Sequence, residues 1–137
     1  MIRVLVVDDE KLARDGLRAF LAREKDILIV AEARDGQEAV ELTCDLAPDV
    51  ILMDIKMPVL DGLSATKSIC GRESNAKILI LSASYDDTLL RKALANGAHG
   101  YVAKHEGYLE LGKAVRTVHE GKAYFSPSIA KLLPPAS

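Results

Sequence analysis

Five short apolar runs, spaced about two dozen residues apart, constrain the fold of this chain more than any other feature. The runs are nearly continuous rather than alternating, and they are rich in β-branched residues, which is typical of strands covered on both faces. They lie at residues 2–7, 27–31, 50–53, 77–81 and 100–103. The spacing leaves room for one strand and one crossover helix in each unit.

The segments between these runs have the period of amphipathic helices. Asp35 with Glu38 three residues later marks a helix start, and Gly97 and Gly121 mark helix ends. Strand–helix alternation repeated five times predicts an α/β fold with a parallel sheet and helices on both faces. We expect this domain to span residues 1–121. After it, residues 122–137 are interpreted as a short helix and the start of a linker.

Composition narrows the class of protein further. A length of 137 residues suits one domain, and 18 basic against 20 acidic residues provide no basic face for nucleic acid. No apolar run approaches the roughly 18 residues of a membrane span, and the N-terminus lacks a signal-peptide pattern. We therefore expect a cytoplasmic protein without membrane contact. Cys44 and Cys70, which have no metal or redox spacing, should be reduced and partly buried.

Polar side chains follow four of the five predicted strands. Asp8 and Asp9 follow the first strand and Asp54 follows the third. Ser82 ends the fourth, and Lys104 comes directly after the fifth. In open α/β sheets, ligands bind beyond the carboxyl ends of the strands. If the second strand lies at an edge, the other four ends gather these side chains into one pocket.

The chemistry of this residue set favours a phosphoryl group. Three clustered carboxylates repel one another unless a cation joins them, and oxygen-only ligands suit Mg²⁺. Phosphoryl transfer requires little beyond positioning and charge compensation, and a carboxylate can itself be the nucleophile. Taken singly, each aspartate could be a helix cap, the serine a satisfied strand-end hydroxyl and the lysine a solvated charge. Those separate roles do not predict that all of these residues occur together at four strand ends.

These residues lie in motifs that resemble the receiver domain of bacterial two-component response regulators. The motifs are Val-Val-Asp-Asp-Glu at residues 6–10, Asp-Ile-Lys-Met-Pro at 54–58 with Asp-Gly at 61–62, Ser-Ala at 82–83, and Gly-Tyr-Val-Ala-Lys at 100–104. The resemblance covers residues 2–121. It implies a flavodoxin-like (βα)5 doubly wound fold, with five parallel strands in the order 2-1-3-4-5.

The resemblance also assigns roles at the pocket. It implies that Asp54 accepts a phosphoryl group from a sensor histidine kinase. Asp8, Asp9 and Asp54 would hold Mg²⁺ together with the backbone carbonyl of Lys56. Lys104 would pair with the incoming phosphoryl oxygens. The domain would then be a phosphoacceptor in signalling rather than an enzyme acting on a separate substrate.

A second set of residues would carry the switch. The resemblance implies that Ser82 moves to hydrogen-bond the phosphoryl group and that Tyr101 turns inward to fill the vacated space. Lys56 and Ser84 occupy the positions where the family tunes phosphoryl lifetime. His105 follows the lysine where many receivers have proline, so the sequence leaves open whether the peptide before it is cis, since a non-proline cis bond costs about 2.5–4 kcal/mol.

The C-terminal segment suggests a subclass. Gly-Lys-Ala-Tyr-Phe-Ser-Pro at residues 121–127 resembles the junction in NarL/FixJ-type transcription factors, whose receiver precedes a LuxR-type helix-turn-helix domain. The resemblance implies that this chain would reach DNA only through such an output domain and that phosphorylation would favour a homodimer. Two alternatives are a stand-alone receiver that shuttles phosphoryl groups or docks a partner, and a small Mg²⁺-dependent phosphatase. Against the phosphatase, Lys56 stands where such enzymes place a second aspartate.

Overall fold

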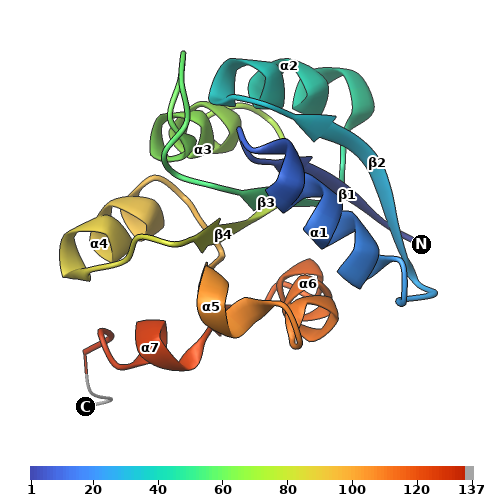
Figure 1. Cartoon of the computed structure of the whole chain (residues 1–137). Coiled ribbons are helices and arrows are strands. Elements are labelled where there is room, and N and C mark those ends of the chain that lie inside the picture. Colours follow the sequence, from blue (N-terminus) through green and yellow to red (C-terminus); the bar gives the residue numbers. More distant parts are fainter. Residues whose placement is uncertain (135–137) are drawn as a thin grey trace.

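The computed structural model describes residues 1–134 and has a doubly wound α/β fold (Figure 1). All paired strands are parallel, in the order β2-β1-β3-β4-β5-β6. The strands are β1 (Ile2–Val7), β2 (Ile27–Ala33), β3 (Val50–Met53), β4 (Lys77–Ser82), β5 (Gly100–Ala103) and β6 (Tyr124–Phe125). The helices are α1 (Lys11–Leu21), α2 (Gly36–Leu46), α3 (Gly62–Cys70), α4 (Asp87–Ala95), α5 (Lys104–Gly107), α6 (Leu111–His119) and α7 (Pro127–Ala130).

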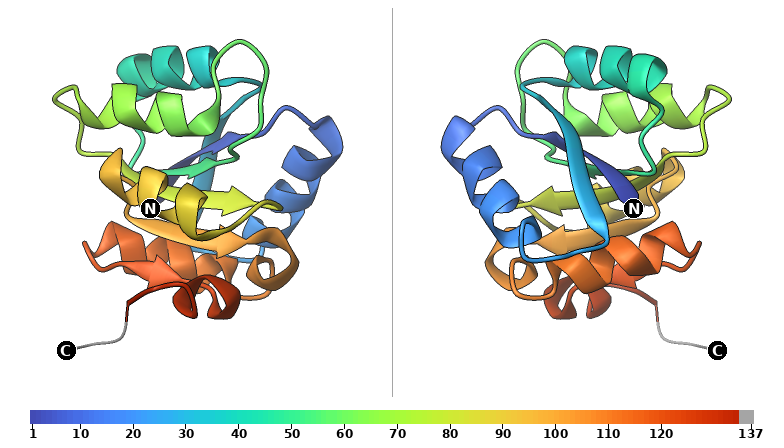
Figure 2. Two further views of the ribbon diagram at one scale, coloured as in Figure 1. Left: turned by 90° about the vertical axis from the view of Figure 1, so that its left-hand side faces the viewer. Right: turned by 90° about the vertical axis from the view of Figure 1, so that its right-hand side faces the viewer.

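Helices cover both faces of the sheet, as the continuous apolar runs predict (Figure 2). One face packs against α2, α3 and α4 through side chains that include Val40, Ile69 and Leu90. The other packs against α1 and α6, with Leu17 and Val115 in its core. The strands β1, β3, β4 and β5 are buried along almost their whole length, whereas the edge strand β2 is only partly buried.

The predicted order 2-1-3-4-5 is confirmed, but the predicted count of five strands is wrong because β6 adds a sixth. Tyr124 pairs with Gly100 and Phe125 pairs with Tyr101. Without this pairing, β5 would be an edge strand with unpaired backbone groups. Gly100 allows the close approach, since a Cβ atom there would lie 2.5 Å from the carbonyl oxygen of Tyr124. Two residues are too short to show a strand period in the sequence.

The segment after β5 also differs from a single fifth helix. It forms the short helix α5 and then the longer helix α6. The peptide between Lys104 and His105 is trans, as are all peptide bonds of residues 1–134. The helix α7 lies where a short helix was expected, whereas the last three residues of the expected linker fall outside the described part of the chain.

Local signals set the helix boundaries as expected. The carboxylate of Asp35 accepts a hydrogen bond from the backbone N–H of Glu38 at 2.8 Å and so caps α2. Gly97 and Gly121 have φ values of 107° and 87°, which end α4 and α6 in the left-handed region that glycine favours. Both cysteines are free. Cys70 is half-buried as expected, but Cys44 is exposed, so its expected burial is wrong. Among the described residues, no helix is long and apolar enough to cross a membrane.

Candidate functional site

The three strand-end aspartates meet at the carboxyl edge of the sheet. One carboxylate oxygen from each of Asp8, Asp9 and Asp54 lies within 4.8 Å of the other two. Because β1 and β3 are neighbours, with Val7 paired to Met53, the residues that follow them come side by side. A cavity of about 180 Å³ opens here, lined in part by Asp9, Asp54, Lys56, Ser82, Ser84 and Lys104. Larger cavities of about 320 and 450 Å³ lie elsewhere. Within residues 1–134, however, the group of three carboxylates that could hold a metal ion lies beside the smaller cavity described here.

Asp8 is almost fully buried, and both of its carboxylate oxygens have partners. Oδ1 accepts a hydrogen bond from the backbone N–H of Glu10 at 3.0 Å, and Oδ2 accepts one from Nζ of Lys104 at 2.8 Å. Neither Asp8 nor Asp9 caps the first helix, since the N-cap residue of α1 is Glu10 and its side chain makes no capping bond. The carboxylates are therefore free of the structural role that caps would give them.

Asp54 faces the cavity between the other carboxylates and the lysine. Its Oδ1 accepts a hydrogen bond from the N–H of Ile55 at 2.8 Å, and its Oδ2 lies 3.5 Å from Nζ of Lys104. Burial raises the pKa of Asp54 and the nearby charge of Asp8 raises it further, whereas Lys104 opposes both effects. A bound divalent cation would likewise favour the ionised carboxylate.

Lys104 is the cation of the site. Burial alone would lower its pKa, but the hydrogen bond to Asp8 and the charges of Asp54 and Asp8 outweigh burial, so the pKa of Lys104 is raised. The ammonium group is therefore charged at neutral pH and available to pair with further oxygens. Its position as the first residue of α5 depends on β5 lying next to β4 in the sheet.

Two glycines hold the loop that carries Asp54 and Lys56. The N–H of Gly62 donates to the carbonyl of Ile55 at 2.8 Å, and a Cβ atom at Gly62 would lie 1.8 Å from the carbonyl oxygen of Asp54. Gly36, at the start of α2, donates to the carbonyl of Leu60 at 2.9 Å. Backbone approaches this close exclude any side chain, so the glycines fix how the loop sits over the sheet.

Ser82, Ser84 and Tyr101 form a connected group beside the cavity. The Oγ atom of Ser82 accepts a hydrogen bond from the N–H of Ser84 at 3.1 Å, so its own hydroxyl proton is not used in that bond. The hydroxyl of Tyr101 donates to the carbonyl of Ser84 at 2.5 Å. Tyr101 is fully buried, and burial raises its pKa to about 12. In this structure Tyr101 is therefore already in the inward position.

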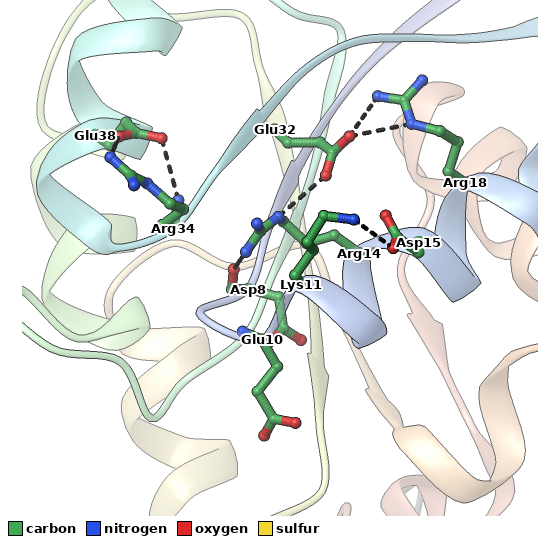
Figure 3. Close-up of polar contacts among 9 residues, drawn as sticks. All are labelled: Asp8, Glu10, Lys11, Arg14, Asp15, Arg18, Glu32, Arg34 and Glu38. Carbon is green, nitrogen blue, oxygen red and sulfur yellow. Dashed lines mark hydrogen bonds and ion pairs between the residues drawn. The ribbon is translucent and has the colours of Figure 1, made fainter.

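The sequence prediction missed one residue that contacts the acidic cluster. Arg14 of α1 is buried and donates from Nη1 to the backbone carbonyl of Asp8 at 2.8 Å (Figure 3). A signal was available, since Arg14 lies three and seven residues before Leu17 and Leu21, on the apolar stripe of the helix. A charged residue in such a stripe must find a buried partner.

Comparison with known proteins agrees with the motifs. Residues 4–116 match the family model described as the response regulator receiver domain. The chain belongs to this family. Receiver domains are signalling domains, and phosphorylation by a kinase is their general function.

Relatives of this receiver domain include longer regulatory proteins. It is 41% identical over 130 residues to the transcriptional regulatory protein LiaR of Bacillus subtilis, covering 95% of this chain and 62% of LiaR. It is 39% identical over 131 residues to the response regulator UvrY of Escherichia coli, covering 96% of this chain and 60% of UvrY. The chain thus spans about three fifths of the length of these curated relatives.

Solved structures share the receiver fold. The chain superposes with a TM-score of 0.90 on a LuxR-family two-component response regulator from Aurantimonas, at 35% identity, covering 94% of this chain and 92% of that one. The signal receiver domain of the response regulator NarL from Mycobacterium tuberculosis gives a TM-score of 0.85 at 34% identity, covering 88% of this chain and 98% of that one.

Proposed function

We propose that Asp54 of this receiver domain accepts a phosphoryl group from the phosphohistidine of a sensor histidine kinase. The observation that carries this proposal is the cluster of the Asp8, Asp9 and Asp54 carboxylates, in which Asp8 and Asp54 also pair with the ammonium group of Lys104. A nucleophilic carboxylate, a fixed cation and an acidic cluster are together what an aspartyl phosphate requires.

The acidic cluster fits Mg²⁺, because its donor set consists only of oxygen atoms. Asp8, Asp9, Asp54 and the backbone carbonyl of Lys56 would hold the ion. When bound, Mg²⁺ would supply positive charge to the phosphoryl oxygens.

The transfer itself uses the chain's own groups. A bond forms between a carboxylate oxygen of Asp54 and phosphorus, while the phosphorus–nitrogen bond breaks and its electron pair stays on the kinase imidazole. Lys104 compensates the charge of the phosphoryl oxygens from its place between Asp8 and Asp54. The N–H of Ile55 holds one oxygen of Asp54, which orients the carboxylate before attack.

Ser82 and Tyr101 would transmit the effect of Asp54 phosphorylation to neighbouring segments. The hydroxyl proton of Ser82 is not used in its bond with the N–H of Ser84, so it can be donated to a phosphoryl oxygen, and turning Ser82 toward that oxygen would disturb the bond with Ser84. Because Ser84 also accepts the hydroxyl of Tyr101, a movement of this segment reaches the aromatic ring. Lys56 and Ser84 line the cavity, where their side chains would control the access of water and so the phosphoryl lifetime.

The output that we propose is control of transcription through a C-terminal DNA-binding domain of the LuxR type, with phosphorylation favouring a homodimer. The similarity to LiaR, a transcriptional regulatory protein, supports this subclass. Residues 122–137 would comprise β6, the short helix α7 and the start of the linker.

The test is phosphorylation by a small-molecule phosphodonor in the presence of Mg²⁺, read by mass spectrometry of the intact chain. We expect one added phosphoryl group, which Asp54→Asn should prevent. Asp49→Asn, at the residue that directly precedes β3 at the end of the strand opposite to Asp54, is the matched control and should be phosphorylated normally. Unmodified wild-type protein, or a modified Asp54→Asn variant, would refute the proposal. Repeated turnover of free phosphate esters would instead favour the phosphatase.

A further inference from the structure

Arg14 is a buried arginine beside the acidic loop, and its charge requires specific partners. It has two. Nη1 donates to the backbone carbonyl of Asp8 at 2.8 Å, and Nε donates to the carboxylate of Glu32 at 3.0 Å (Figure 3). The guanidinium group thus bridges the loop after β1 to the edge strand β2.

Glu32 is itself held firmly. It pairs with Val6 in the parallel register of β2 and β1, which places it near the end of β1. Its second oxygen accepts hydrogen bonds from Nη2 and Nε of Arg18 at 2.6 and 3.0 Å. The hydrogen bond from Arg18 is the main reason that the pKa of Glu32 is lowered, although burial opposes it. An ionised and anchored Glu32 therefore fixes the plane of the Arg14 side chain.

The contact with Asp8 has a consequence for the next residue. The N–H of Asp8 donates to the carbonyl of Ala33 at 3.1 Å, and its carboxylate has the two partners described above. The carbonyl, beyond the end of the strand pairing, is bound by Arg14. Since the carbonyl of Asp8 and the N–H of Asp9 belong to one planar peptide group, this bond fixes the direction in which Asp9 leaves the strand.

We propose that Arg14 is a positioning residue for the cation site, because it orients the peptide between Asp8 and Asp9 so that both carboxylates converge with that of Asp54. This inference rests on the proposed function, in which a divalent cation binds to these carboxylates. Charge alone predicts the opposite effect. A guanidinium group repels a cation, so its removal would tighten cation binding if Arg14 acted only through its charge. Positioning predicts weaker binding.

The experiment is calorimetric titration of the whole chain with Mg²⁺ in the absence of any phosphodonor. For Arg14→Met we expect the dissociation constant to rise about 10-fold, as is typical when a group that orients metal ligands is removed. Arg14→Lys keeps the charge but lacks the planar fork that reaches both partners, so we expect binding to stay several-fold weaker than in the wild type. The matched control is Arg116→Met, at another arginine whose guanidinium group bridges two partners, the carboxylates of Glu24 and Asp26, without contact to Asp8 or Glu32. It should bind Mg²⁺ within about twofold of the wild type.

A second readout separates positioning from loss of the fold. Saturating Mg²⁺ should largely restore the rate at which Arg14→Met is phosphorylated, because the acceptor Asp54 is not altered. Where Arg14→Met does not fold by circular dichroism, Arg14→Lys and Glu32→Gln provide the test, and each should bind Mg²⁺ more weakly than the wild type. If the folded Arg14 variants bind Mg²⁺ as tightly as the wild type or more tightly, or if Arg14→Lys alone binds it as tightly as the wild type, Arg14 is not a positioning residue. Either result would leave the proposed function intact. Wild-type protein that binds no Mg²⁺ would overturn the cation site of the proposed function as well.

Discussion

Replacing Tyr101 by phenylalanine should reverse its effect on stability between neutral and alkaline pH. At neutral pH the change removes the hydrogen bond to the carbonyl of Ser84, which costs about 1 kcal/mol. At high pH the buried phenol lowers the stability of the fold. Its pKa is raised to about 12 in the fold from an ordinary value of 10.0, since burial disfavours the phenolate. The folded protein thus keeps a proton that the unfolded chain loses, and stability falls as pH rises above 10.

The size of this loss follows from linkage. Each unit of pKa shift corresponds to about 1.4 kcal/mol, so the wild type should lose up to about 2.7 kcal/mol as the pH passes through 12. Tyr101→Phe lacks this contribution, and the two proteins should be equally stable near pH ~10.7, where the linkage loss reaches the ~1 kcal/mol of the hydrogen bond. Above that pH the variant should be the more stable protein.

The assay is urea unfolding of both proteins at several pH values between neutrality and 12, with the tyrosinate absorbance of the folded protein recorded in parallel. Subtracting one curve from the other removes the lysines, the remaining tyrosines and other groups common to both proteins. A difference in the free energy of unfolding that stays constant across this range would refute the reasoning. It would mean that Tyr101 titrates in the fold as it does in the unfolded chain.

Three further outcomes are expected. Mg²⁺ at ten times its dissociation constant should raise the free energy of unfolding by about 1.4 kcal/mol, and Asp9→Asn should weaken this stabilisation. Identical thermal unfolding curves with Mg²⁺ and with a chelator would contradict the prediction. Gly62→Ala places a Cβ atom 1.8 Å from the backbone oxygen of Asp54, so it should lower the free energy of unfolding, measured with urea, by about 1–3 kcal/mol. It should also slow phosphorylation of Asp54, and an unchanged rate would argue against the loop constraint. Ser126→Ala leaves the buried N–H of Ala103 without its acceptor at 2.9 Å and should cost about 1–3 kcal/mol, more than the control Ser128→Ala; equal losses would be the contrary result.

The features that the sequence predicts well are those with a local physical cause. Strands buried on both faces must be apolar at nearly every position, so β1, β3, β4 and β5 are visible as continuous runs. The polar residues that interrupt these runs then lie at strand ends, where the parallel topology brings them together. This is why the sequence alone predicts that Asp8, Asp54 and Lys104 lie together, although their roles stay predictions.

The features that the sequence does not predict depend on contacts between distant segments. The strand β6 forms because β5 has an open edge, and nothing in Tyr124 and Phe125 themselves requires a strand. Arg14 lies on the apolar stripe of α1, but the sequence alone does not show that Glu32 of β2 is its partner. Gly62 looks like an ordinary helix start, and only the 1.8 Å approach to Asp54 shows why no side chain fits. In each case the constraint lies on the partner segment.

The position of Lys104 also connects the site to the C-terminal segment. The residue before it, Ala103, donates its N–H to the hydroxyl of Ser126 at 2.9 Å, and two residues after it Glu106 accepts the N–H and hydroxyl of Ser128 at 3.0 and 2.7 Å. The residues on both sides of the lysine thus contact the start of α7, Ala103 through its backbone N–H and Glu106 through its side chain. If phosphorylation draws the ammonium group toward new oxygens, as we propose, these bonds would transmit the movement to the segment that follows the sheet, together with the pairing of β5 and β6. If the domain signals through its C-terminus, as proposed, Ser126→Ala and Ser128→Ala should each weaken this connection, and their effects can be measured separately.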